Sequence, residues 1–335
     1  MFCHIISCML MLVLFTSTSH GQSASRKKII IDTDLFSDVD DAGALLLAST
    51  IDSAELLAVN VNYPSSYSAF AASSILGHYQ HSHVPIGLTR PINDDTFWDR
   101  MMFEYGEFAS KVAYHWRNAS SLSFAEEAWD PVDLYRKILA EQDDDSVTIA
   151  SIGFLENLSA LLNSTADCYS QLSGLELVTA KVSELVIMGG DYPSGYEWNF
   201  YGFGPAITAH VVHTWPSAMT FLGSQVGENV LSGRRLVEEG PDADPVRSAY
   251  IWYNGRDKAR YSWDPLTTLY AVQGLGELFK YGNSGGHNHI YPNGSNVWLP
   301  ESKGNSQHWL ELAVPPTAAG KVLDELFLDG ARRFA

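Results

Sequence analysis

Residues 27–50 read KKIIIDTDLFSDVDDAGALLLAST and contain five aspartates within ten positions. An apolar run at 28–31 precedes them and predicts a short buried strand, and the small and apolar residues at 42–49 predict the start of a helix. A dense group of carboxylates therefore lies in one turn between two buried elements. The five residues are Asp32, Asp34, Asp38, Asp40 and Asp41.

The same alternation of apolar runs and helical patterns continues along the chain. Strands are expected at 56–62, 84–88, 147–151, 184–188 and 218–222, and helices at 69–81, 155–162 and 205–213. Strands that alternate with helices predict parallel pairing with helices on both faces. We therefore expect an α/β fold: a single domain with a mostly parallel central β-sheet flanked by helices, Rossmann-like in type. A helical insertion or lid is expected at 89–145, and hairpins or loops at 281–312.

Composition and charge limit the class of partner. The 335 residues are 46% hydrophobic and 18% charged, which is typical of a globular chain with ample core. The formal net charge of −18 repels polyphosphate, so we expect no nucleic-acid polymer as a partner. A neutral small molecule or a cation fits this charge better. Assembly into a homo-oligomer stays open.

The N-terminus has the pattern of a secretory signal. Residues 5–15 (IISCMLMLVLF) form an apolar stretch that is too short to span a bilayer. Ser19 and Gly21 satisfy the small-residue rule for cleavage before Gln22. We therefore expect a signal peptide at 1–21, a mature domain at 22–335, secretion to the extracellular space and no membrane association after cleavage. An uncleaved membrane anchor is the alternative.

Glycosylation sequons agree with a secretory route. Asn118, Asn163 and Asn293 lie in polar surroundings and are expected to carry glycans. Asn157 lies in an apolar helical pattern, so we expect it to remain unmodified. After signal removal, Cys168 is left without a partner for an internal disulfide.

The aspartate turn predicts a metal site. Ligands of such sheets bind beyond the carboxyl ends of the strands, where this turn lies. Carboxylates packed this closely repel one another, and a divalent cation is the simplest relief. Oxygen ligands select Ca²⁺ or Mg²⁺. The alternative is a helix-capping cluster on a solvated turn, for which one or two aspartates would be enough.

The aspartate turn resembles the signature of the inosine–uridine type nucleoside hydrolases. That signature is a strand ending in Asp-x-Asp, here residues 32–34, followed by Asp-Asp-Ala, here 40–42 after a longer loop. Other matching motifs follow in the family order: Ser151-Ile152-Gly153, Met188-Gly189-Gly190, Glu197-Trp198-Asn199 and Ser262-Trp263-Asp264-Pro265. The resemblance covers residues 28–270. It implies hydrolysis of the N-glycosidic bond of ribonucleosides to ribose and free base by a Ca²⁺-bound water.

The resemblance also implies roles for individual residues. Metal ligands would be Asp34, Asp41, the Ile152 carbonyl and Asp264, and Asp34 would also take a proton from the attacking water. Substrate would be held by Asp40, Asn62, Glu197, Asn199 and Asp264. Asn60, two positions earlier in the expected strand, is the alternative to Asn62.

One residue departs from the common pattern. Many family members carry a histidine directly before the late aspartate as the acid for the leaving group, and this chain has Trp263. An aromatic residue there resembles the purine-preferring subgroup, in which the base is stacked. Trp263 is therefore the second catalytic candidate, and purines are the expected bases. Core packing of the indole is the alternative.

Two other classes of function stay open at this stage. A phosphatase of the haloacid-dehalogenase type also begins with a strand and Asp-x-Asp, but it expects Thr or Val where Phe36 stands. No Gly-Lys-Ser and no arginine cluster near the motifs offers a phosphate site. A non-catalytic secreted protein that binds Ca²⁺ or a ligand on the same scaffold is the other alternative. His287 and His289 would share one face of a strand, as a second metal site or as surface histidines.

Overall fold

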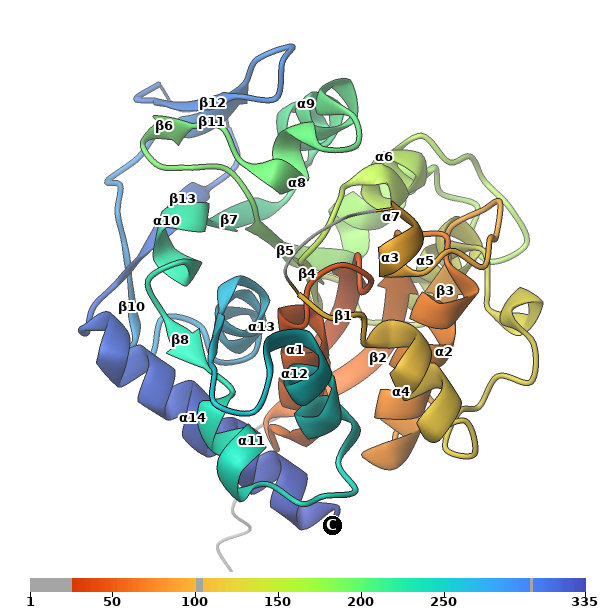
Figure 1. Cartoon of the computed structure of the whole chain (residues 1–335). Coiled ribbons are helices and arrows are strands. Elements are labelled where there is room, and N and C mark those ends of the chain that lie inside the picture. The colour runs from red at the N-terminus through yellow and green to blue at the C-terminus, as the bar shows by residue number, and fades with distance from the viewer. Residues whose placement is uncertain (1–25, 101–104, 302–303) are drawn as a thin grey trace, which may run out of the picture.

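The computed structural model describes residues 26–100, 105–301 and 304–335. Its centre is an eight-stranded sheet with strand order β10-β13-β7-β5-β4-β1-β2-β3 (Figure 1). All neighbouring strands in this sheet pair in parallel except β10 with β13. The strands are β1 (Lys27–Thr33), β2 (Ala54–Val61), β3 (Ile86–Leu88), β4 (Val147–Ser151), β5 (Val182–Met188), β7 (Ala218–Leu222), β10 (Phe279–Tyr281) and β13 (Gln307–Leu312). The mostly parallel sheet is confirmed, whereas the predicted signal peptide at 1–21 lies outside the described residues.

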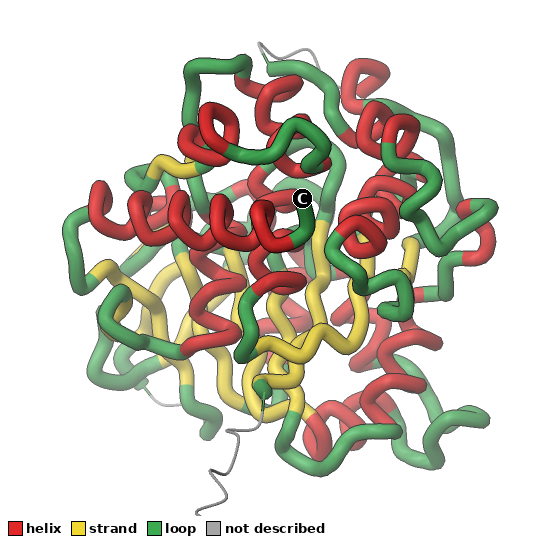
Figure 2. Tube along the Cα trace, turned by 90° about the horizontal axis from the view of Figure 1, so that it is seen from below, coloured by secondary structure: helices red, strands yellow, loops and turns green. Residues whose placement is uncertain are grey.

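Helices cover both faces of the sheet, as Figure 2 shows. On one side of the sheet lie α1 (Asp40–Thr50), α2 (Ser66–His78) and α13 (Trp263–Gln273), and α4 (Ala109–His115), α12 (Pro245–Asn254) and α14 (Pro316–Arg333) pack on these helices in the same core cluster. The other face packs against α5 (Pro131–Ala140), α6 (Glu156–Leu162), α7 (Gly174–Lys181) and α9 (Pro205–Thr214). Each expected helix is therefore present, with ends shifted by a few residues.

Short elements complete the fold around this frame. They are α3 (Phe97–Arg100), η1 (Ala125–Glu127), β6 (Ser194–Gly195), α8 (Trp198–Tyr201), α10 (Ser224–Gly227), β8 (Leu231–Ser232), α11 (Arg234–Glu239), β9 (Arg260–Tyr261), β11 (His287–Ile290) and β12 (Asn296–Leu299). None of the helices in the described ranges combines the length and apolar composition that a bilayer crossing requires.

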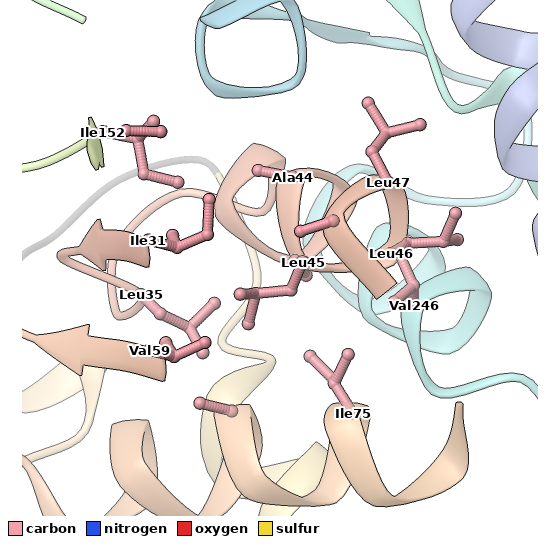
Figure 3. Close-up of a cluster of buried hydrophobic side chains, with 14 of the residues drawn as sticks. Ile31, Leu35, Ala44, Leu45, Leu46, Leu47, Val59, Ile75, Ile152 and Val246 are labelled. Atoms are coloured by element: carbon pink, nitrogen blue, oxygen red, sulfur yellow. The ribbon is translucent and has the colours of Figure 1, made fainter. Parts of the chain in front are cut away.

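The alternation of β1 side chains explains why both faces of the sheet are covered. Ile29 and Ile31 belong to the core cluster on the α1 side, and Ile30 belongs to the cluster on the opposite side. Neighbouring side chains on a strand point to opposite faces, so this apolar run is buried twice. Figure 3 shows Ile31 next to Leu45 of α1. Every residue of α1 is buried, which fixes the helix that follows the aspartate turn.

Two sequence expectations need correction. The region 89–145 is not only an insertion, because α5 packs its apolar side on the sheet and connects β3 to β4. The region 281–312 contains the expected hairpin, β11 with β12, but its last residues form β13 inside the main sheet. Both elements are placed by contacts that are distant in sequence, and local patterns do not reveal such contacts.

The order of the strands places the aspartate turn at a functional position. From β1 the chain proceeds through β2 and β3 toward one edge of the sheet, and β4 then pairs with the other side of β1. Ligands of open α/β sheets bind at the carboxyl ends of the strands at this kind of reversal. The aspartate turn follows the carboxyl end of β1 and therefore lies at the reversal.

Candidate active site

A cavity of about 320 Å³ opens beyond the carboxyl ends of β1, β4 and β5. Eight residues singled out in the sequence line it: Asp34, Asp40, Asp41, Ile152, Glu197, Asn199, Trp263 and Asp264. They come from four segments that are spread over more than two hundred positions of the chain. The fold therefore brings the separate motifs into one site.

Three carboxylates form the densest part of the cavity wall. Asp40, Asp41 and Asp264 are buried, and each offers an oxygen that lies within 4.8 Å of the others. Asp34 also lines the cavity and is 9% exposed. Hard oxygen donors in this number suit a divalent cation such as Ca²⁺ or Mg²⁺. The cluster could therefore hold a metal.

Hydrogen bonds from α13 and from β1 hold two of these carboxylates in place. Asp40, in the first turn of α1, accepts the backbone N–H of Trp263 at 3.0 Å and that of Asp264 at 3.2 Å. The Thr33 hydroxyl donates to Asp41. An aspartate at the start of α1 therefore caps the start of α13, and helix N-termini favour such negative charge.

Burial and mutual repulsion raise the pKa values of the cluster. Burial raises the pKa of Asp34 to about 7, and the negative charge of Asp38 adds to the effect. Burial also raises the pKa values of Asp40, Asp41 and Asp264 well above the usual range, with a further contribution from their neighbouring carboxylates. A bound cation would favour the ionised forms and reverse this shift.

A second wall of the cavity carries Glu197 and Asn199 at the start of α8. The Glu197 carboxylate accepts the N–H of Gly190 at 3.0 Å and that of Asn199 at 2.9 Å. Burial raises the pKa of Glu197 to about 7, although these two N–H donors oppose the shift. The Asn199 amide donates to the Met188 carbonyl at 3.2 Å. The two side chains are thus fixed in orientation and present oxygen atoms near the cavity.

The glycine pair after β5 makes this arrangement sterically feasible. Gly190 has φ of +78°, a conformation that favours glycine. At Gly189, an added Cβ would lie 2.2 Å from the Phe200 ring. The Met-Gly-Gly motif therefore allows α8 to approach the end of β5 closely.

Trp263 is the first residue of α13 and lines the cavity beside Asp264. Its indole N–H donates to the Ser224 carbonyl at 2.8 Å. It is partly exposed, so it is not simply a core residue. The indole is held in one orientation against the cavity, which leaves the stacking prediction open to test.

Asn62 is the one predicted site residue that does not line the cavity. It is buried, and its amide donates to Asp32 at 2.6 Å and to the Phe154 carbonyl at 2.8 Å. Asn60 is also buried away from the cavity. Asn62 therefore supports the segment after β4 that contains Ile152.

A buried polar network surrounds Asp32 below the site. The Tyr135 hydroxyl donates to Asp32 at 2.8 Å, and the Asn157 amide donates to it at 3.2 Å. Asn157 is only 4% exposed, so its side chain is inaccessible to a glycan in the folded chain. That Asn157 remains unmodified stays a prediction, for which this burial gives a physical reason.

Sequence reasoning missed one charged residue of the cavity, Arg260. It lines the wall and pairs with Asp38 through its Nε at 2.8 Å. A single arginine has no periodic pattern, so its position could not be foreseen. His287 and His289, on β11, lie outside the one group of possible metal ligands found among the described residues. The His287 Nδ1 lies 2.6 Å from the Glu301 carbonyl oxygen.

A doubly covered parallel sheet with a buried acidic cluster at its strand reversal defines a class of α/β enzyme with a potential metal site. Within that class, residues 29–308 match the sequence profile of the inosine-uridine preferring nucleoside hydrolases, and the chain belongs to this family. It is therefore an N-glycosidase that acts on nucleosides. Neither a phosphatase nor a non-catalytic binding protein is favoured.

Solved structures share the fold at low sequence identity. A plant nucleoside hydrolase, PpNRh1, has 18% identity and a TM-score of 0.66, with 90% of this chain and 99% of that chain covered. An inosine-uridine preferring nucleoside hydrolase from Bacillus anthracis has 18% identity and a TM-score of 0.64, covering 92% and 98%. A purine-preferring ribonucleoside hydrolase from Gardnerella vaginalis has 16% identity and a TM-score of 0.65, covering 92% and 100%. No curated protein matches the chain in sequence.

Proposed function

We propose that the chain hydrolyses purine ribonucleosides to ribose and free base with the help of Ca²⁺. One observation carries this proposal: a buried carboxylate cluster, the Glu197–Asn199 pair and an indole line the same cavity. Each of the three groups matches one part of a nucleoside at its reacting bond. The net charge of −18 agrees with an uncharged substrate and disfavours polyphosphate.

The acidic wall supplies the hydrolytic half of the reaction. Asp34, Asp41, Asp264 and the Ile152 carbonyl would hold the cation, which when bound supplies Lewis acidity that lowers the pKa of water. Asp34 accepts the proton of the attacking water, since it lines the cavity and its carboxyl group is buried. The surrounding negative charge also stabilises the positive charge that develops on the sugar.

The opposite wall orients the sugar. Glu197 and Asn199 accept and donate hydrogen bonds to sugar hydroxyls, together with Asp40 and Asp264. Backbone N–H groups already fix the Glu197 carboxylate, so little side-chain freedom is lost when the substrate binds. The sugar is thereby held with its reacting carbon near the acidic wall.

Trp263 supports the preference for purines. The residue precedes Asp264 on α13, so an indole surface lies next to a proposed ligand of metal and sugar. Stacking on an aromatic side chain is worth about 1–3 kcal/mol per base, and a two-ring base covers more of the indole than a one-ring base. The purine-preferring hydrolase from Gardnerella vaginalis, which shares the fold, agrees with this proposal.

A nucleoside panel tests the proposal. The purified protein is incubated with inosine, adenosine, guanosine, uridine and cytidine, with and without a chelator, and free ribose is measured. We expect ribose release that is faster for the purine nucleosides and is abolished by the chelator. Release that survives complete removal of divalent cations would refute the proposed role of Ca²⁺.

We also propose that the mature protein begins at Gln22 and is secreted. Asn118, Asn163 and Asn293 are exposed and can therefore accept glycans, in contrast to the buried Asn157. N-terminal sequencing of protein from the natural source tests the cleavage, and a mass shift on glycosidase treatment tests the glycans. A cytosolic protein that retains Met1 would contradict this proposal.

A further inference from the structure

Arg260 is a nearly buried cation in a cavity wall that is otherwise rich in carboxylates. It belongs to β9, is 9% exposed and lines the cavity. Its Nε lies 2.8 and 3.1 Å from the two oxygens of Asp38, and its Nη2 also contacts Asp38. Its Nη1 donates to the Tyr105 hydroxyl at 3.2 Å. The guanidinium group is thus bound from several sides to one carboxylate and one phenol.

Aromatic rings restrict this guanidinium further. Four ring centroids lie between 4.8 and 5.4 Å from its Cζ atom. Rings at this distance attract the cation and fill space around it. The rings belong to Tyr105, Tyr253, Tyr261 and Trp263. The cation therefore has little freedom to move, and its position in turn restricts Asp38.

The ion pair joins the two segments that carry the acidic cluster. Asp38 lies in the loop between Asp34 and Asp40, and Arg260 lies four positions before Asp264. The paired residues are 222 positions apart in the sequence. Among the hydrogen bonds of the described residues, a second polar connection between these segments runs from the backbone N–H groups at the N-terminus of α13 to Asp40. The helices α1 and α13 themselves pack closely together in one apolar core. The ion pair adds a polar connection outside that packed interface, between the loop before α1 and the residues before α13.

We propose that the Asp38–Arg260 ion pair positions the aspartates of both segments for binding of a divalent cation. The inference rests on the cation binding of the proposed function. In this role Arg260 and Asp38 are positioning residues and not ligands. A protein without the ion pair keeps the aspartates that bind the cation but no longer holds them at fixed distances from one another. It therefore binds the cation more weakly.

Simple electrostatics makes the opposite prediction for Arg260. A positive charge near a cation site repels the ion, so its removal alone would strengthen binding. The negative charge of Asp38 attracts the ion, so its removal alone would weaken binding. The sign of the change in Ca²⁺ affinity at Arg260 therefore separates positioning from charge.

The experiment measures the dissociation constant of Ca²⁺ for the chelator-stripped full mature protein by competition with a fluorescent chelator. We expect Arg260→Gln and Asp38→Asn each to weaken binding by about tenfold or more. Arg260→Lys keeps the charge and loses the bidentate geometry, so we expect an intermediate loss. The double variant should bind like the single variants, since they remove the same pair.

Several outcomes would overturn the inference. They are unchanged or tighter Ca²⁺ binding by Arg260→Gln, binding by Arg260→Lys equal to that of the unmodified protein, and restoration of affinity in the double variant. If Arg260→Gln does not fold, as judged by circular dichroism of the metal-free protein, Arg260→Lys decides the question, because it keeps the charge and loses only the bidentate geometry.

A matched control removes another arginine from a carboxylate pair. Arg235→Gln breaks the exposed Arg235–Glu239 pair on α11 and should leave Ca²⁺ binding unchanged. Ca²⁺ binding by the unmodified protein separates failure of the proposed function from failure of the positioning role. If it binds no Ca²⁺, the metal of the proposed function fails and the inference fails with it. If all variants bind equally well, only the positioning role fails.

Discussion

At the scale of single residues, Asp34 has two roles in the proposed mechanism, as the general base and as a ligand of the cation. Replacement by asparagine removes the proposed base and one cation ligand while it preserves shape. We expect Asp34→Asn to lower kcat/KM by about 10²–10⁴-fold or more, the range for loss of a general base. Steady-state ribose release measures this change. The fold should survive, because the substitution also relieves repulsion between Asp34 and its neighbours.

The control for this prediction is Asp52→Asn. Asp52 is an exposed carboxylate that pairs with Arg333 on the surface, and it does not line the cavity. We expect its loss to leave turnover unchanged. Near-normal turnover of Asp34→Asn itself would remove Asp34 from the mechanism.

In the proposed mechanism, Trp263 favours purine bases by stacking. We expect Trp263→Ala to lower kcat/KM for inosine more than for uridine, because the larger base loses more stacking. A change of about tenfold in the ratio of the two efficiencies corresponds to 1.4 kcal/mol. Trp263→Phe should retain part of the preference. If the ratio is the same in Trp263→Ala as in the unmodified protein, the indole serves packing alone.

At the scale of elements, α5 is joined to the segment after α6 by a buried arginine. Arg136 is 1% exposed and binds Asp167 through its Nε at 2.6 Å and its Nη2 at 3.1 Å. It also donates to the carbonyls of Ser170 and Leu172. Without the Asp167 carboxylate, the positive charge of the buried Arg136 would lack a compensating negative charge. We expect Asp167→Asn to lower the free energy of unfolding by about 2–3 kcal/mol in denaturant titrations.

The pH dependence of the same pair has a defined sign. Hydrogen bonds from the Arg136 side chain lower the pKa of Asp167 to about 2. A carboxylate with a lowered pKa contributes stability above its unfolded pKa of about 4 and loses it as the pH falls toward 2. Asp167→Asn should therefore flatten the acid side of the stability curve. Lys137→Gln, which breaks the exposed Lys137–Glu141 pair, should change stability by less than about 0.5 kcal/mol.

Some helices and strands can be predicted from the local sequence, and others cannot. The apolar run before Asp32 and the helix pattern after Asp41 predicted β1 and α1, because both signals lie within a few residues. Strand β13 escaped prediction, because its place beside β7 depends on a partner far away in the sequence. For the same reason, the pairing of Arg260 with Asp38 is visible only in the folded chain.

The site was predictable to the extent that its residues occur in short motifs. Asp34, Glu197 and Asp264 stand in such motifs, and the structure places all three in the cavity. Asn62 was chosen from the family resemblance, without a short motif around it, and it follows the end of β2. Its amide lies instead beside Asp32.

At the scale of the whole molecule, the acidic cavity makes the metal-free protein sensitive to pH. Burial raises the pKa of Asp34 from 3.8 and that of Glu197 from 4.5, in each case to about 7. Between about pH 4 and about pH 7 the folded chain binds more protons than the unfolded chain, so the free energy of unfolding falls as the pH rises. The stability contributed by the protonated forms of Asp34 and Glu197 is fully present below about pH 4 and is lost as the pH rises through about 7. We expect the metal-free protein to melt several degrees lower at pH 8 than at pH 5.

Calcium should reverse this trend, because protons and the cation compete for the same carboxylates. Free Ca²⁺ at a hundred times its dissociation constant stabilises the folded chain by about 2.7 kcal/mol. The dissociation constant itself should fall from pH 5 to pH 8, so a fixed Ca²⁺ concentration raises the melting temperature more at pH 8. Differential scanning fluorimetry with chelator and with Ca²⁺ at both pH values measures these melting temperatures.

Asp34→Asn, which removes one titrating group, should show a weaker pH dependence of the melting temperature in chelator. A metal-free protein that melts higher at pH 8 than at pH 5 would show that the cavity carboxylates do not dominate its pH response.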